Sequence, residues 1–122
     1  MTRLSKLLGL AGLAAMAAGP ALAHHSAAMF DAAKTVTITG VVKEYHWQNP
    51  HASLDVAAAD AALWSVEMST PNILVRKGWS IKSFQPGDKV SIVMHPMKDG
   101  GKAGLLMNVT NAKGAVLKDH DY

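Results

Sequence analysis

The sequence predicts an all-β protein, a small five-stranded OB-like Greek-key barrel with one short helix between its third and fourth strands. Three observations predict it. Segments that alternate polar and apolar residues recur between turn signals, as half-buried strands do. A single helical segment follows the third of these strands, as in OB-type barrels. The 122-residue chain contains no cysteine, so its core alone must stabilise it, which favours a closed sheet. A generic β-sandwich is the alternative.

Residues 1–23 are typical of a cleavable signal peptide. Arg3 and Lys6 give a positive start, residues 7–18 form an uninterrupted apolar run, and Ala21-Leu22-Ala23 offers small residues before a cleavage site. The run is shorter than the ~20 residues that span a bilayer, which argues against a membrane anchor. We therefore expect cleavage after Ala23 and a soluble periplasmic or secreted product.

The first strand is predicted at residues 35–45, after an N-terminal arm at 24–34 that shows no clear period. Gly40 interrupts the alternation of this strand and predicts a bulge or a sharp bend. The second and third strands are predicted at residues 52–56 and 63–68, joined by an alanine-rich hairpin.

The short helix is predicted at residues 71–77. Thr70 suits the N-cap, and Pro71 suits the first helical position, where its missing N–H costs nothing. Gly78 suits a left-handed C-cap. Both Ile73 and Leu74 are expected to point inward.

Trp79 is expected to pack back over the helix. The fourth and fifth strands are predicted at residues 89–95 and 104–110, followed by a turn and the apolar pair 116–117. The chain therefore divides into a signal peptide (1–23), an arm (24–34), the barrel domain (35–118) and a frayed tail (119–122).

Charge and composition exclude several functions. The net charge of +3 falls to +1 when Arg3 and Lys6 leave with the leader, and no long basic run remains, so nucleic acid is excluded as a partner. Without cysteine there is no disulfide, zinc–thiolate site or thiol catalysis. The chain also lacks a nucleophile elbow and a phosphate-binding glycine loop, which argues against a hydrolase or a nucleotide enzyme. We expect a protein that is not an enzyme, although a redox enzyme remains an alternative.

The new N-terminus points to metal binding. Cleavage after Ala23 leaves His24 with a free α-amine and an imidazole, which together chelate one ion. Copper(II) favours such tetragonal nitrogen coordination, completed by a further histidine. His51 and His95 are the candidate partner ligands because each stands at a strand end, and His25 is a substitute ligand. The alternative is that His24 and His25 are solvated residues on the arm.

Other side chains are less favoured as metal ligands. A thioether from Met94 or Met97 would favour copper(I), although methionines more often fill a core. Glu67 is expected either to pair with a basic residue or to support a ligating histidine.

A metal-free binding module is the second hypothesis. A rim at the barrel mouth, where OB-type barrels take ligands, would contact a small ligand or an exported protein partner. Its candidate residues are His46, Trp47, Asn49, Arg76 and Trp79. In the structural alternative, Asn49-Pro50 forms a turn and Trp47 covers the core. His51 then forms a hydrogen bond with a backbone carbonyl. The third hypothesis is an accessory subunit of an exported redox enzyme.

The chain resembles a family of small exported bacterial proteins that is known only as a domain of unknown function. The resemblance implies that the His-His start and the Asn-Pro-His turn recur in the family, and it implies no activity. It covers nearly all of the chain after residue 23 and rests on these segments: His24-His25-Ser26, Met29-Phe30-Asp31, Lys34-Thr35-Val36, Gly40-Val41-Val42, Trp47-Gln48-Asn49-Pro50-His51, Trp64-Ser65-Val66-Glu67-Met68, Pro71-Asn72, Gly78-Trp79, Pro86-Gly87-Asp88 and His95-Pro96.

Overall fold

The computed structural model describes residues 27–120. The predicted signal peptide and the first arm residues, His24 and His25 among them, lie outside the described residues, as do residues 121–122. None of the described helices has the length and hydropathy of a membrane span.

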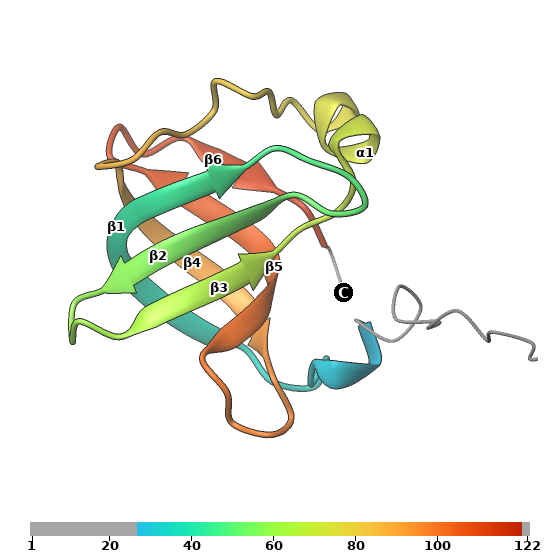
Figure 1. Ribbon diagram of the computed structural model, residues 1–122, viewed down its shortest axis with the longest axis vertical. Helices are drawn as coiled ribbons and strands as arrows, with labels where there is room; N and C mark the ends of the chain where they lie inside the picture. The colour runs from blue at the N-terminus through green and yellow to red at the C-terminus, as the bar shows by residue number, and fades with distance from the viewer. Residues whose placement is uncertain (1–26, 121–122) are drawn as a thin grey trace, which may run out of the picture.

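The described residues form a closed β-barrel with one short α-helix (Figure 1). A 3-10 helix, η2, precedes the first strand. The elements in chain order are η2 (Ala27–Met29), β1 (Val36–His46), β2 (Ser53–Ala58), β3 (Leu63–Glu67), α1 (Pro71–Arg76), β4 (Lys89–Pro96), β5 (Ala103–Asn111) and β6 (Val116–Lys118).

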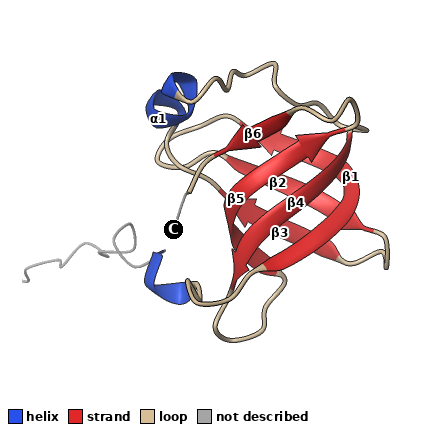
Figure 2. Cartoon of the chain, turned by 180° about the vertical axis from the view of Figure 1, so that it is seen from behind, coloured by secondary structure: helices blue, strands red, loops and turns tan. Residues whose placement is uncertain are grey.

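The strand order is β3-β2-β1-β4-β5-β6, and a parallel pairing of β3 with β5 closes the barrel. The predicted five-stranded barrel with its helix between the third and fourth strands is confirmed. The apolar pair at 116–117 belongs to β6, a short additional strand on β5. In both views η2 and α1 lie on the same side of the barrel, and the chain after β6 runs between them (Figure 1 and Figure 2).

The alternation of polar and apolar side chains along the strands places the apolar ones in the core. The side chains expected to point inward from β3 and β4 are buried, as are most large apolar side chains of β2 and β5. The fully buried ones include Leu54, Val56, Val66, Met68, Ile92, Met94, Leu106 and Val109.

Gly40 is required by a close approach of two backbones. It pairs with Ala58 of β2 and with Val90 of β4, so β1 forms ladders along both of its edges at this residue. A Cβ atom on Gly40 would lie 2.2 Å from the carbonyl oxygen of Ala57. The register shift of β1 lies further along, between Val42 and Glu44, and not at the glycine itself.

The helix ends follow the sequence signals. Thr70 has the extended dihedral angles of an N-cap, although its side chain makes no capping hydrogen bond. Gly78 adopts a positive φ of 91° after the last turn. Leu74 is fully buried, as expected, but the expectation that Ile73 points inward is wrong. A single face of this short helix meets the core, and Ile73 lies on the wall of a surface pocket.

The end of the described chain is held firmly, so the expectation of a frayed tail is wrong for Asp119 and His120. Asp119 is fully buried, and its Oδ2 accepts a hydrogen bond from the backbone N–H of Ser69 at 2.7 Å. Lys77 donates to the main-chain oxygen of Asp119, and its Nζ lies 3.7 Å from Oδ1. Trp79 is buried, its ring packs against Phe84, and its indole N–H donates to the carbonyl of Lys118 at 2.9 Å.

Substitution of Gly40 tests the close approach. Gly40→Ala is expected to lower the free energy of unfolding by about 1–3 kcal/mol, because the new methyl group must displace the Ala57 carbonyl. Urea unfolding measures the change. Thr39→Ala is the control, since that side chain is exposed on the same strand and its removal should change stability by less than about 0.5 kcal/mol. A Gly40→Ala protein as stable as the parent would contradict the contact.

Candidate functional site

A pocket of about 230 Å³ opens between η2, the end of β3 and the start of α1. It brings together segments that are far apart in the sequence, including the end of the described chain. Its lining contains two imidazoles and one carboxylate. The lining residues are Ala27, His51, Glu67, Met68, Ser69, Thr70, Ile73, Leu105 and His120.

Contacts of both ring nitrogens fix the orientation of the His51 imidazole in this pocket. Its Nδ1 lies 3.1 Å from the carbonyl oxygen of Met68, and its Nε2 lies 3.8 Å from Oε1 of Glu67. A carbonyl oxygen only accepts a hydrogen, so Nδ1 donates, and Nε2 of the neutral ring presents its lone pair. A backbone carbonyl on one ring nitrogen is the usual way in which a protein orients a metal-binding histidine. The structural role predicted for His51 and its ligand role are therefore compatible.

His120 forms another wall of the pocket. Its Nε2 lies 3.5 Å from Oγ of Ser69 and 3.4 Å from Oδ2 of Asp119. Burial lowers the pKa of His120 below its ordinary value, and Lys77 and His95 lower it further, against the opposing effect of Asp119 and Glu67. The ring is therefore neutral at neutral pH and keeps a lone pair on one nitrogen.

The arm reaches this pocket. Phe30 is buried and forms an isolated β-bridge with Met97, and the backbone N–H of Asp31 donates to the carbonyl of Pro96. These contacts anchor the arm beside the end of β4 and place Ala27 in the pocket wall. The direct contacts of His24 and His25 lie outside the described residues.

His95 is placed differently from His51. Its side chain is 1% exposed, and Nδ1 donates to the carbonyl oxygen of Lys34 at 2.8 Å. It does not line the pocket. Met94 is fully buried in the core and offers no accessible thioether, whereas Met97 is half-buried next to the arm.

The residues expected to form a ligand-binding rim differ widely in their exposure. Trp79 is 2% exposed and belongs to the core. Trp47 is half-buried and packs edge-on against Tyr45, with ring centroids 5.8 Å apart. Asn49 is exposed in the loop between β1 and β2, and Arg76 is exposed at the end of α1. His46 instead contacts two carboxylates on the outside of the barrel.

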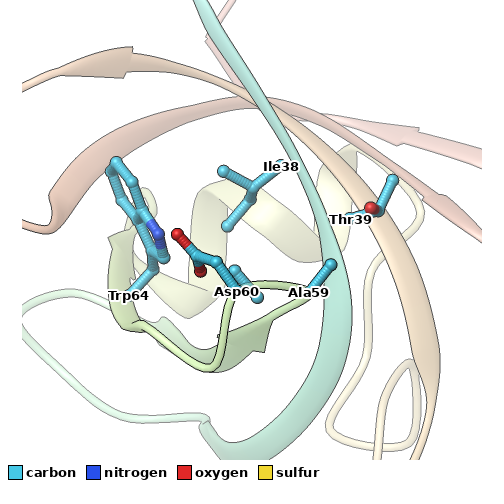
Figure 3. Close-up of a pocket in the computed structure, with 6 residues that line it drawn as sticks. Ile38, Thr39, Ala59, Asp60 and Trp64 are labelled. Carbon is cyan, nitrogen blue, oxygen red and sulfur yellow. The ribbon is translucent and has the colours of Figure 1, made fainter.

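A second hollow of about 230 Å³ lies between β1 and the β2–β3 hairpin (Figure 3). Asp60 is its one titratable group, and Oδ1 of Asp60 accepts the backbone N–H of Ala62 within the turn. The remaining lining is Ile38, Thr39, Ala58, Ala59 and Trp64. This hollow therefore offers fewer titratable groups for binding or catalysis than the pocket around His51.

A comparison with protein-family models matches residues 12–108 to a family described as "Family of unknown function (DUF6152)". The chain belongs to this family. Membership in DUF6152 confirms the expected resemblance to an uncharacterised domain family. No curated protein and no solved structure matches the chain.

Two features of this DUF6152 member escape sequence reasoning. His120 was assigned to a frayed tail, and no local pattern indicates that Asp119 would anchor it. The grouping of Glu44 and His46 with Asp55 was also missed, although their positions on neighbouring strands were available. Knowledge of the strand register would have identified that group.

Acidification should weaken the metal-free protein partly through His120. Its pKa is lowered in the folded state, so the unfolded chain binds the proton more readily. Stability from this group is present above the unfolded value of about 6.5 and is lost as pH falls from there through the lowered folded value.

Urea midpoints at pH 7.5 and pH 5 test this expectation. His120→Gln is expected to lose less stability on acidification than the parent, and His46→Gln serves as the control imidazole deletion. The assignment to His120 is contradicted when the His120→Gln protein shows the full pH dependence of the parent.

Proposed function

We propose that this protein binds copper outside the cytoplasm through the N-terminal histidine of its processed chain. The observation that carries the proposal is that Ala27, three residues after His24, lines the same pocket as His51. Three residues span at most about 10 Å, so an N-terminus at His24 is no further than that from the Ala27 wall of the pocket.

The ligand set follows from the donor atoms available there. His24 supplies its α-amine and imidazole, and His51 supplies Nε2, which gives three nitrogens in the arrangement that copper(II) favours. Glu67 lies next to that nitrogen, where it stabilises the bound cation. His25 is the substitute for His24, and His120 offers a further neutral imidazole from another wall of the pocket.

The pocket side chains alone are too widely spaced to hold an ion. Among residues 27–120, one set of three potential ligands has all its ligand atoms within 4.8 Å, and that set lies elsewhere, at Glu44, His46 and Asp55. A metal at His51 therefore needs donors from the arm, and His24 is the nearest source with two. His95 has no role in this version of the site because its ring is buried and bonded to Lys34.

The test compares two purified forms, one that begins at His24 and one with an added alanine ahead of it. Copper(II) titration is followed by d–d absorption and electron paramagnetic resonance. The natural start is expected to bind one copper tightly with nitrogen hyperfine structure, and the extended form is expected to lose this site because its amine becomes an amide.

Two substitutions refine the result. His51→Ala is expected to weaken binding at least about tenfold, and Glu67→Gln about tenfold, as for groups that support a ligand. His46→Ala is the matched control and should leave the site dependent on His24 intact. Equal copper binding by the two N-terminal forms would rule the proposal out, as would mass spectrometry showing that the exported protein begins at another residue.

A further inference from the structure

The register shift in β1 determines which side chains face outward at its end. Val42 is buried and Tyr45 packs against the core, although they are three residues apart and would face opposite sides of a regular strand. The bulge between Val42 and Glu44 restores the inward direction at Tyr45. Glu44 and His46 consequently share the outer face. Asp55 lies directly opposite Glu44, between two fully buried residues of β2.

These three outward side chains converge. Nε2 of His46 lies 3.0 Å from Oδ2 of Asp55 and 3.2 Å from Oε2 of Glu44. All three ligand atoms lie within 4.8 Å of one another, which no other set among the described residues achieves. His46 and Asp55 are about one third exposed, and both are carried by paired strands.

Two carboxylates share one imidazole nitrogen in this cluster. A ring nitrogen carries at most one hydrogen, yet two carboxylates approach Nε2 of His46 at hydrogen-bond distance. The single Nε2 hydrogen therefore cannot satisfy both carboxylates fully, and the Glu44 side chain, which is 65% exposed, is also open to solvent. A divalent cation among the three atoms would interact with both carboxylates and with the lone pair of the ring at once.

We propose that Glu44, His46 and Asp55 form a Zn²⁺ site, separate from the pocket at His51 and independent of the N-terminus. Zinc bonds of 2.0–2.2 Å to nitrogen and oxygen in a tetrahedron place neighbouring ligand atoms about 3.3 Å apart, close to the 3.0 and 3.2 Å that separate Nε2 of His46 from the two carboxylate oxygens. One imidazole and two carboxylates suit zinc and offer no soft sulfur ligand. Three protein ligands leave the fourth position for water.

The experiment uses the form with an alanine ahead of His24, in which the proposed copper chelate is disabled. Isothermal titration with Zn²⁺ measures affinity, and Co²⁺ reports tetrahedral geometry through its visible d–d bands. We expect one equivalent to bind. Asp55→Asn and His46→Gln should each lower the affinity at least about tenfold.

Asp60→Asn is the matched control, since it makes the same carboxylate-to-amide change in the adjoining hairpin, outside the cluster. It should bind zinc as the parent does, and so should His51→Ala. Thermal unfolding of the metal-free variants confirms that each is folded. Absence of zinc binding, or binding unchanged by both cluster substitutions, overturns this site without bearing on the copper test. Loss of zinc binding in His51→Ala alone would assign the ion to the pocket and also overturn it.

Discussion

Strand β1 joins the β2–β3 hairpin to β4 and β5, because it forms backbone ladders along both of its edges. Residues 36–41 pair with β4 and residues 40–46 pair with β2, so the two ladders overlap at Gly40 and Val41. The neighbouring backbone comes so close at Gly40 that a side chain has no room. Val42 still bonds through its backbone to Gly87 and Asp88, and the bulge that follows it adjusts which residues of β1 face the core. The same strand thus joins the two parts of the barrel and sets the direction of His46.

The pocket at His51 depends on a different set of contacts, made by the end of the chain. The carboxylate of Asp119 is withdrawn from solvent and is tied to the backbone of Ser69 and to Lys77. A buried carboxylate is tolerated when hydrogen bonds and an opposite charge compensate it. This anchor holds His120 at the wall of a pocket that also contains Ala27 of the arm. Both ends of the described chain therefore meet at one place on the barrel.

The features of the fold that depend on residues close together in the sequence could be predicted. Alternation in β3 and β4 located the core, and the Thr70-Pro71 and Gly78 signals located both ends of α1, because each is a local conformational preference. The positions of Asp119 and His120 depend instead on contacts with Ser69, 50 and 51 residues away. No local pattern reports such a contact. The cluster at His46 also required the register of two strands.

The location of both chain ends has a practical consequence for purification. An oligohistidine affinity tag fused after Tyr122 would begin three residues after His120, which lines the pocket. In the processed form that we propose, a tag fused ahead of His24 would convert its amine to an amide and add foreign imidazoles a few residues from Ala27. Either fusion would introduce competing metal donors beside His51. Material for metal analysis therefore needs native termini, obtained without a tag or with one that is removed completely.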